Sequence, residues 1–568
     1  PVADNIWQVA LNAAAAPNHY ADAMSCELRD GYADALAALM QAFTIRRAVQ
    51  IVHLPFWRPL AHAIRDTHRW KITYDCMDEW DSFPNIGAPL LAEERTLVAS
   101  CDLLTVTSRL LQEKWAPQRP DALLLRNGVD NAFFAAGLKP SAILAGAPRP
   151  VIGFYGALAE WIDFDLIAGL ADLAPDWTFA LVGDHFTPEV EKLQDKANIH
   201  MPGLRPYAEM PAYLHAFDAC IIPFKLNKIT HAVDPVKFYE FLAGGKPIVS
   251  TPLAELQPFA DFVAFAETPD QFKHEIERQL EANSSDAIAA RQAFAAANDW
   301  HVRFELYRDA IKRLHPLVSI VIVTFGNLDL TRLCIDSVLA NTEHPHFEII
   351  IVDNASSDGT PDYLRALADQ HDHVRIVLND SNRGFAAANN QGLALADGDI
   401  LVLLNNDTVV PAGWLSGLLA RLDDDKIGLV GPVTNAVGNE AKVAPGYADL
   451  ADLQRFADER RTRFAGKHFD IAMLAMFCVA MRRDVVEQVG PLDENFGIGM
   501  FEDDDYSMRV KAAGLRVVCA EDVYIHHFGQ AAFKKLIENG EYDTLWRRNQ
   551  AYYESKWGAW TPHAPRPG

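Results

Sequence analysis

Residues 399–411, which read DILVLLNNDTVVP, give the clearest indication of the fold. Residues 400–404 form an unbroken apolar run, which is typical of a strand buried on both faces of a parallel sheet. The run leads into two amides, the carboxylate of Asp407 and a hydroxyl. Ligands of open α/β sheets bind at such strand ends, and a carboxylate there can hold a hard divalent cation that in turn holds a diphosphate. Taken alone, however, the stretch is more often an Asn/Asp turn after a strand.

Three apolar segments before this stretch have the same form. Residues 317–325, 347–352 and 374–378 each read as a buried strand that leads into polar residues. The carboxyl ends of parallel strands meet at one edge of a sheet, so four such ends in succession predict a nucleotide site along that edge. There Asp353 would accept hydrogen bonds from a pyrimidine, and Gly384 would let the backbone approach the ligand. The residues predicted to bind the nucleotide are Thr324, Asp353, Asn382, Arg383, Gly384, Asn405 and Asn406.

A second candidate site is the acidic segment 501–505, FEDDD, which precedes a helix that Gly514 stops. The simpler explanation is that acidic residues favour a helix N-terminus through the helix dipole. Four adjacent carboxylates also repel one another, however, which raises their pKa values and suits a general base. An acceptor molecule is predicted to lie against Trp414, Asn435 and Glu440, although a core position for Trp414 is as well supported.

The first 315 residues alternate strands with helices, which predicts doubly wound parallel sheets. Strands are expected at residues 49–54, 70–74, 103–107 and 123–125, and again at 151–155, 178–182, 219–223 and 247–250. An early strand is expected at residues 5–11, and the Pro- and Ala-rich passage 139–150 reads as a linker. We therefore expect two lobes, 1–140 and 141–315, and a third domain at 316–568.

Residues 231–251, HAVDPVKFYEFLAGGKPIVST, read as a loop, a helix that starts near Pro235, a glycine stop and a strand. Lys237 and Glu240 are three residues apart and therefore share one helical face. A lysine near a helix N-terminus suits a diphosphate, and a carboxylate one turn later suits ribose hydroxyls. The spacing alone slightly favours the alternative, an ordinary exposed Lys–Glu pair.

The composition limits the classes of function. A formal charge of −25 argues against non-specific nucleic-acid binding, which relies on Lys and Arg. Seven dispersed cysteines without a CxxC pair indicate reduced thiols, as in a cytosolic protein. No apolar run approaches the roughly 18 residues that span a bilayer. The residues Lys534, Lys535, Arg547 and Arg548 could form a local basic patch but are more simply explained as a solvated helix face.

The motifs SIVIVTF, IIIVDNASSDGT, NRGFAAANNQG and LLNNDT cover most of residues 317–411 and together resemble family-2 glycosyltransferases of GT-A fold. The resemblance implies that Asp407 binds the metal ion, Mg²⁺ or Mn²⁺, with Asn405 as a weaker partner. A histidine near the end of the family's domain completes the metal site. Both His526 and His527 match that position, and we favour His526.

The same resemblance implies the roles of the acidic segment. The second residue of the family's Glu-Asp pair takes the proton from the acceptor hydroxyl, which assigns that role to Asp503, after Glu502. The transfer would invert the anomeric carbon. The variant of the motifs found here is similar to rhamnosyltransferases and related enzymes of bacterial surface-glycan synthesis.

The N-terminal part resembles the family-4 glycosyltransferases of GT-B fold, through residues 231–251 and through the order of the strand ends before them. The resemblance implies that Lys237 contacts the donor's phosphate and Glu240 its ribose, with Gly156 and Pro235 beside them. The chain departs from the family pattern at Ala232, where a second glutamate is usual.

The two resemblances imply a bifunctional glycosyltransferase, with a GT-B-like pair of Rossmann-type lobes followed by a GT-A nucleotide-sugar-binding domain. In the GT-B-like pair, the lobe at 1–140 would hold the acceptor, and the lobe at 141–315, with a helix that returns to the first lobe, would hold the donor. Its donors would be UDP-, dTDP- or GDP-sugars, and its acceptor a bacterial surface glycan of O-antigen, capsule or S-layer type, free or lipid-linked. Such an enzyme is expected in the cytoplasm or at the cytoplasmic face of the inner membrane, beside other glycan-assembly enzymes. The alternative is that only the GT-A module is catalytic and that the N-terminal half is a glycan-binding or scaffold module.

Overall fold

The computed structural model describes residues 6–11, 17–43, 45, 48–135, 144–529 and 539–566. The chain divides into two compact units, Pro1–Leu314 and His315–Gly568. All seven cysteines are free thiols, and six of them are buried. None of the helices formed by the described residues is both long and apolar enough to cross a bilayer.

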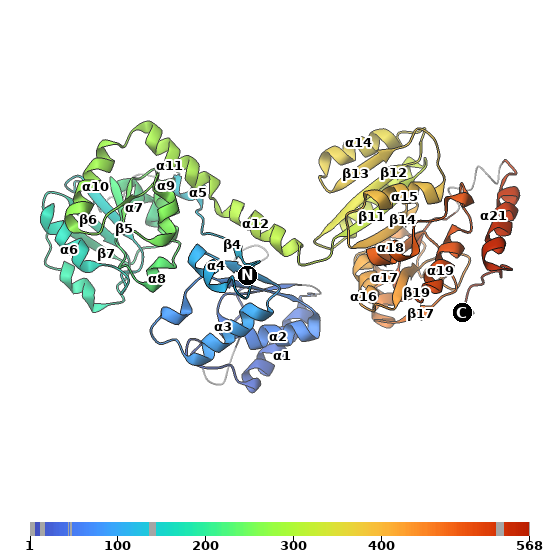
Figure 1. Cartoon of the computed structure of the whole chain (residues 1–568), viewed down its shortest axis with the longest axis horizontal. Coiled ribbons are helices and arrows are strands. Elements are labelled where there is room, and N and C mark those ends of the chain that lie inside the picture. The colour runs from blue at the N-terminus through green and yellow to red at the C-terminus, as the bar shows by residue number, and fades with distance from the viewer. Residues whose placement is uncertain are drawn as a thin grey trace. The chain divides into compact units, whose positions relative to one another are not determined.

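The N-terminal lobe of the first unit, which carries the helices labelled α1 to α4 in Figure 1, is built on a four-stranded parallel sheet in the order β1-β2-β3-β4. The apolar run of β3 is buried at every residue. The elements of this lobe are β1 (Val49–Val52), β2 (Lys71–Cys76), β3 (Leu103–Val106) and β4 (Leu123–Leu124), with helices α1 (Cys26–Ala42), α2 (Arg58–His68), α3 (Ala88–Ser100) and α4 (Arg109–Trp115).

The strand expected at residues 5–11 is wrong for the part that the structure describes, because residues 6–11 form no strand of this sheet. Ile6, Trp7 and Val9 are all about half exposed, so their apolar side chains have no core to cover. Trp7 has an edge-on ring contact with Phe43, just after helix α1. Helix α1 precedes the first strand instead, and the sequence pattern did not indicate it.

The second lobe holds a six-stranded parallel sheet in the order β10-β9-β8-β5-β6-β7. The chain starts in the middle, moves outward in one direction through β7, and returns beside β5 at β8. The reversal between β5 and β8 is a topological switch point, where doubly wound sheets bind ligands. The strands are β5 (Val151–Tyr155), β6 (Thr178–Val182), β7 (Ile199–Gly203), β8 (Ala219–Ile222), β9 (Ile248–Ser250) and β10 (Ala264–Phe265). The helices are α5 (Asn131–Ala135), α6 (Phe164–Leu173), α7 (Met210–Ala216), α8 (Lys228–His231), α9 (Val236–Ala243), α10 (Pro269–Glu281) and α11 (Ser285–Ala297).

Helix α12 (Trp300–Lys312) follows the second lobe and contacts the first. Arg303 donates from Nε to the Asn127 carbonyl over 3.2 Å. The Tyr307 hydroxyl lies 2.6 Å from the hydroxyl of Thr73 on β2. The helix therefore ties the two lobes of the first unit together.

The second unit is organised by an eight-stranded mixed sheet in the order β13-β12-β11-β14-β18-β16-β19-β17. The stretch that begins at Ile400 forms β14, which lies between parallel β11 and antiparallel β18, and residues 400–404 are all buried. The strands are β11 (Val318–Thr324), β12 (Phe347–Asp353), β13 (Val374–Leu378), β14 (Ile400–Asn405), β16 (Ile427–Val433), β17 (His468–Asp470), β18 (Cys478–Arg482) and β19 (Arg516–Tyr524).

Alternate residues of the central strands face two different helical layers. Val402 and Leu404 belong to one core, with side chains of α13, α14 and α16, whereas Leu401 and Leu403 belong to the other, with α15, α17, α18 and α19. The helices are α13 (Leu328–Asn341), α14 (Thr360–Gln370), α15 (Phe385–Leu395), α16 (Trp414–Leu422), α17 (Leu453–Arg463), α18 (Arg483–Val489), α19 (Glu502–Ala512) and α21 (Tyr542–Trp557). Burial of both faces explains why these strands read as continuous apolar runs.

Candidate functional sites

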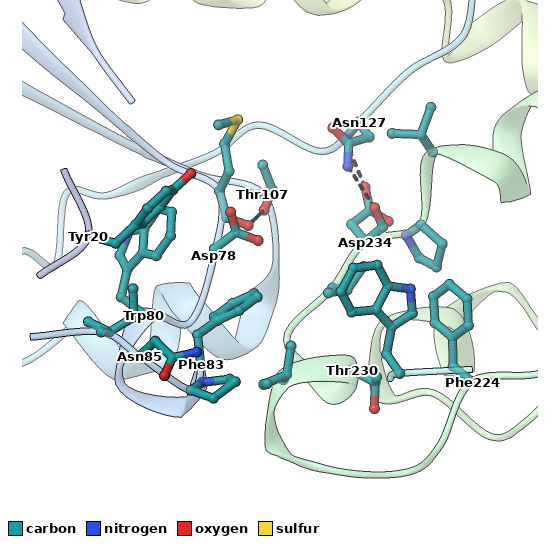
Figure 2. Close-up of a pocket in the computed structure, with 18 of the residues that line it drawn as sticks. Tyr20, Asp78, Trp80, Phe83, Asn85, Thr107, Asn127, Phe224, Thr230 and Asp234 are labelled. Carbon is teal, nitrogen blue, oxygen red and sulfur yellow. Dashed lines mark hydrogen bonds between the residues drawn. The ribbon is translucent and has the colours of Figure 1, made fainter. Parts of the chain in front are cut away.

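A cavity of about 810 Å³ lies between the two lobes of the first unit (Figure 2). This volume is in the range of small-molecule sites, which are mainly apolar with a few placed polar groups. First-lobe side chains that line it include Tyr20, Asp78, Trp80, Phe83, Asn85 and Thr107, and second-lobe side chains include Trp161, Phe224, Thr230, Asp234, Pro235 and Lys237.

Lys237 belongs to the first turn of α9, after Pro235, which caps the helix. Its side chain passes over Gly156 at the end of β5, where an added Cβ would lie 2.2 Å from Lys237 Cε. Gly156 has a φ of 137°, so glycine is needed there for its backbone as well as for space. Lys237 makes no hydrogen bond or ion pair with any residue that the structure describes, and burial lowers its pKa. Its ammonium group lies 5.9 Å from the centroid of the Phe154 ring, which is a weak cation–π contact, and an anionic ligand would offset the cost of desolvating the charge.

Glu240 lies one turn further along α9 and is 5% exposed. Its carboxylate accepts a hydrogen bond of 3.1 Å from the Tyr207 hydroxyl, and burial raises its pKa. It forms no ion pair with Lys237 in the described structure, and neither residue is fully exposed. The alternative of an ordinary exposed Lys–Glu pair is therefore wrong.

Asp234 joins the two lobes beside the same cavity. It accepts from the Asn127 backbone N–H over 2.8 Å, and its backbone carbonyl accepts from the Asn127 side chain, as Figure 2 shows. The Arg126 guanidinium lies 3.3 Å from Asp234 and 2.7 Å from Glu255. Burial raises the pKa of Asp234 to about 6, against the charge of Arg126. The sequence pattern gave no indication of this buried ion-pair network.

In the second unit, the ends of β11, β12 and β14 meet at one edge of the sheet, with β13 outside β12. The Thr324 hydroxyl donates to Asp353 over 2.8 Å, and the Ser356 hydroxyl and N–H donate to the same carboxylate. Asp353 is 1% exposed. The three hydrogen bonds use three of the about four acceptor positions of its carboxylate. The next residue, Asn354, reaches Asn382 with its side-chain amide over 2.8 Å. Contact of Asp353 with a pyrimidine stays a prediction.

Gly384 serves a protein contact rather than the approach of a ligand to the backbone. Its φ is 87°, and an added Cβ would lie 2.0 Å from the Gly497 carbonyl oxygen. Phe385 donates its N–H to the Ile498 carbonyl over 3.2 Å. The loop that leads into the acidic helix α19 therefore lies directly against this edge of the sheet. The neighbouring Arg383 side chain is exposed, so it is accessible to an anionic ligand.

Asp407 follows the central strand and is 6% exposed. The short strands β15 (Thr408–Val409) and β20 (His526–His527) pair antiparallel, which brings His527 Nε2 to 3.2 Å from Asp407 Oδ1. His526 instead lies with Nδ1 2.7 Å from the Tyr447 hydroxyl. The preference for His526 is therefore corrected to His527, because adjacent residues of a strand point to opposite faces.

The surroundings of Asp407 and His527 fit a cation. Nδ1 of His527 lies 2.9 Å from the Ala436 carbonyl oxygen and must carry a hydrogen to bond it. In a neutral ring, Nε2 then presents a lone pair to the buried Asp407 Oδ1, which has no hydrogen-bond partner. Metal-bound histidines usually have this arrangement, with the other ring nitrogen on a carbonyl. Among the described residues no group of three or more His, Cys, Asp or Glu could hold a metal ion, so further ligands would have to come from a substrate or water.

The side chain of Asn435, which was predicted to contact the acceptor, instead forms two hydrogen bonds with the backbone of His527. Its side chain accepts from the His527 N–H over 2.9 Å and donates to the His527 carbonyl over 2.9 Å. Trp414, predicted to face the acceptor, is 1% exposed, and its indole N–H points to Thr342 over 3.3 Å. It is a core residue of α16 and cannot stack on a sugar as it is placed here. Glu440 is half-buried and has one buried oxygen without a partner.

The acidic segment forms the first turn of α19. Burial and the negative charges of their acidic neighbours raise the pKa values of Glu502 and Asp503. Asp503 makes one local contact, from the Asp504 N–H over 3.0 Å, and Glu502 has a buried oxygen without a partner. Asp505 is compensated by Arg509, whose Nε lies 2.9 Å away. The segment thus contains both paired and unpaired carboxylates, which the helix-dipole explanation does not require.

The C-terminal segment packs against this acidic turn. His563 Nε2 lies 2.7 Å from Asp504 Oδ1, to which the Trp560 indole N–H also donates over 3.1 Å. The Trp557 indole N–H donates to Asp505 over 2.9 Å. Lys534 and Lys535 of the possible basic patch lie outside the described residues, together with the first part of the linker at 139–143. No local pattern in the sequence indicates the contacts that Trp557, Trp560 and His563 make with the acidic turn.

Two family models match the chain. "Glycosyl transferase family 2" matches residues 319–490, and "Glycosyl transferases group 1" matches residues 149–282. The first match covers the sheet edge and Asp407, and the second covers Gly156, Lys237 and Glu240. Each match lies in a different compact unit of the chain.

Individual relatives cover only parts of the chain. TuaH of Bacillus subtilis, provisionally named a teichuronic acid biosynthesis glycosyltransferase, is 29% identical over 257 residues, which are 41% of this chain and 65% of TuaH. The O-antigen biosynthesis protein RfbC of Myxococcus xanthus is 32% identical over 248 residues, which are 42% of this chain and 19% of RfbC. The chain thus spans less than two thirds of either relative. Among solved structures, HepE of Anabaena in complex with UDP and glucose is 16% identical, with a TM-score of 0.40 over 50% of this chain and 81% of HepE.

Proposed function

Because this chain belongs to the glycosyltransferases, with a group 1 segment followed by a family 2 segment, we propose that it performs two successive sugar transfers. Each unit would use its own nucleotide sugar, and both would extend one bacterial surface glycan of O-antigen, capsule or S-layer type. The glycan class follows from the names of relatives such as RfbC, an O-antigen biosynthesis protein. The acceptor would be a glycan or lipid-linked glycan, reached in the cytoplasm or at the cytoplasmic face of the inner membrane.

The observation that carries the two-site proposal is Lys237 in the first unit, which contacts the Phe154 ring but makes no hydrogen bond or ion pair with a described residue. A half-buried ammonium group beside a cavity and a switch point is suited to the diphosphate of a nucleotide sugar. The second unit has separate chemistry of its own, at Asp407 and Asp503. A chain with a single donor site would have no use for both arrangements.

In the family 2 unit, Asp407 and His527 would hold a divalent cation, Mg²⁺ or Mn²⁺. When bound, such an ion supplies positive charge to the donor's diphosphate. Arg383 would add charge at the same edge. Asp503, with its raised pKa, would accept the proton of the attacking hydroxyl, and the attack would invert the anomeric carbon. The contact of Gly384 with Gly497 supports this division of roles, because it joins the nucleotide edge to the loop before α19.

A second candidate function is favoured by Glu240 and Ala232. The Glu240 carboxylate already accepts a hydrogen bond from Tyr207. Ala232 is 1% exposed, and its side chain has no polar group that could bind a nucleotide sugar. The first unit would then be a glycan-binding module that presents the acceptor to the second unit.

Nucleotide binding to the intact chain separates the two functions. Calorimetric titration with UDP, dTDP and GDP in turn, each with Mn²⁺, is expected to give two sites per chain when the sites are counted over the three nucleotides. Lys237→Met should remove one of the two. A single site that Lys237→Met does not weaken would support the glycan-binding alternative.

A further inference from the structure

The backbone that leads into the acidic turn adopts a conformation that its residues disfavour. Met500 has a φ of 80° and Phe501 a φ of 71°, in the left-handed region that residues with a Cβ rarely occupy. Phe501 is the N-cap of α19, so its conformation sets the direction in which Glu502 and Asp503 leave the loop. Two such residues in succession persist only where the surrounding structure holds them in place.

One side chain of α21 holds this backbone. The amide nitrogen of Asn549 donates to the carbonyl oxygens of Phe496 and Gly499, over 2.8 Å in each case. It also donates to the Met500 carbonyl oxygen over 3.2 Å. Asn549 is 0% exposed, and its amide oxygen has no hydrogen-bond partner in the described part of the chain. A buried amide that leaves its own oxygen unsatisfied to hold three carbonyls indicates that the turn itself is needed.

Aromatic rings of the C-terminal segment hold the same turn. The centroid of the Phe501 ring lies 4.9 Å from that of Trp546, 5.8 Å from that of Tyr553 and 5.3 Å from that of Trp560. These rings belong to a small apolar cluster that is distinct from the two cores of the sheet. The contacts that bury the turn therefore come from α21 and the residues after it.

The loop has a second attachment, at the nucleotide edge of the sheet. Gly497 lies against Gly384, and the Phe385 N–H donates to the Ile498 carbonyl over 3.2 Å. These contacts do not involve Asn549, so they would keep this part of the loop on the sheet in its absence. Loss of the Asn549 amide would then release the turn before α19 and leave the nucleotide edge in place.

We infer that Asn549 is a positioning residue for Asp503, the carboxylate to which the proposed function assigns the acceptor proton. The inference rests on that function and adds α21 to the parts of the second unit that serve it. Because Asn549 is fully buried, it acts through the backbone rather than on a substrate. It holds Met500 and Phe501 in their left-handed conformation and thereby fixes the place of the Asp503 carboxylate beside the attacking hydroxyl.

The test measures transfer by the second unit in the full chain with Lys237→Met, so that the first unit contributes none. The acceptor is surface glycan incubated beforehand with the Asp503→Asn chain and nucleotide sugars, so that it is present whichever unit acts first. Asn549→Ala is expected to lower kcat about ten- to hundredfold, as for a misplaced catalytic group, and to leave KM for the nucleotide sugar unchanged. Asn549→Ser, whose hydroxyl still donates one hydrogen, should lie between.

Tyr552→Phe is the matched control on the same helix. The Tyr552 hydroxyl donates to Asp493 over 2.9 Å and accepts from the Asn495 side chain over 3.2 Å, so it contacts the same loop ahead of the left-handed turn. Removal of this hydroxyl should lower the unfolding temperature of the chain and leave kcat unchanged.

Three results would overturn the inference. In the first, Asn549→Ala keeps kcat. In the second, both Asn549 variants lose affinity for the nucleotide sugar together with kcat, which a merely structural role would produce. In the third, Tyr552→Phe lowers kcat as far as Asn549→Ala, so that the helix acts as a whole. Failure of the proposed function would differ, because Asp503→Asn would then leave transfer by the second unit intact.

Discussion

The carboxylate of Asp407 and the Nε2 atom of His527 face one another at 3.2 Å, and both are hydrogen-bond acceptors when the ring is neutral. The protonated Nδ1 is fixed by the Ala436 carbonyl. A second proton on the ring or a metal ion between the groups would satisfy both acceptors, and so would a water molecule that donates to each. The pairing depends on the two-residue ladder between β15 and β20.

Removal of His527 should therefore weaken metal activation. His527→Ala is expected to raise the Mn²⁺ concentration for half-maximal transfer by the second unit at least about tenfold, comparable to the loss of a group that supports a metal ligand. His526→Gln is the matched control, because its amide can still bond the Tyr447 hydroxyl. Equal effects of the two substitutions on Mn²⁺ activation would contradict the assignment.

Asp503→Asn should remove activity and raise stability. A folded-state pKa above the usual carboxyl value means that stability is lost as pH rises from about 4 toward neutral. Removing the charge should therefore stabilise the protein at pH 8 by about 1 kcal/mol and leave it nearly unchanged at pH 4, since one pKa unit corresponds to ~1.4 kcal/mol. Transfer by the second unit should fall at least about a hundredfold.

Thermal unfolding at the two pH values checks the stability part. Asp505→Asn is a useful comparison, because Asp505 is paired with Arg509 and Trp557 and its loss should destabilise the fold. Destabilisation by Asp503→Asn at pH 8 would mean that the carboxylate is structural.

Lys237→Met should abolish donor binding to the first unit without weakening the fold. The methionine keeps an apolar stem over Gly156 and removes a charge that has a ring contact with Phe154 but no hydrogen bond or ion pair among the described residues. The unfolding temperature is expected to stay the same or rise, whereas nucleotide affinity of the first unit should fall at least about tenfold. Scanning calorimetry with and without nucleotide measures both quantities. A large drop in unfolding temperature would indicate a structural partner instead.

His563→Gln should change the pH dependence of the second unit. The hydrogen bond with Asp504 and the negative charge of that carboxylate raise the pKa of His563, and the positive charge of the His563 imidazolium opposes the rise in the pKa of Asp503. Without it, the carboxylates of Glu502, Asp503 and Asp504 lose a compensating charge, so the acid limb of the pH–rate profile should move upward by up to about one unit. A purely structural role would lower the rate without moving the limb.

Arg566→Gln serves as the control for this change, because Arg566 belongs to the same tail but pairs with Glu521, 3.0 Å away. Its pH–rate profile should keep the original acid limb. An equal displacement of the limb in both variants would mean that the tail acts as a whole rather than through His563.

The sequence predicted those parts of the fold that local patterns determine. The apolar runs that form β11, β12 and β14 are buried on both faces. A strand in that position needs apolar residues at nearly every place, so the sequence run alone indicates it. The meeting of their ends at one edge follows from parallel pairing alone. Lys237 and Glu240 were likewise predictable on one face of α9, although their lack of an ion pair was not.

Features that depend on long-range register were not predictable. His526 and His527 differ by one residue, and only the pairing of β20 with β15 decides which one faces Asp407. Trp414 is buried because α16 packs against the sheet, which no local pattern of one tryptophan reveals. His563 lies far along the chain from Asp504, and no local signal connects them.

The central claim is that the two units use different donors, and donor consumption by the intact chain tests it most directly. Release of nucleoside diphosphate is measured for each nucleotide sugar in turn, with a surface-glycan acceptor, for the wild type, Lys237→Met and Asp503→Asn. We expect the wild type to consume two donors. The variant of the unit that acts second should lose only its own donor, whereas the variant of the unit that acts first should lose both, because the second transfer needs the product of the first. The claim would be contradicted if Asp503→Asn consumed no donor at all while Lys237→Met consumed as much donor as the wild type.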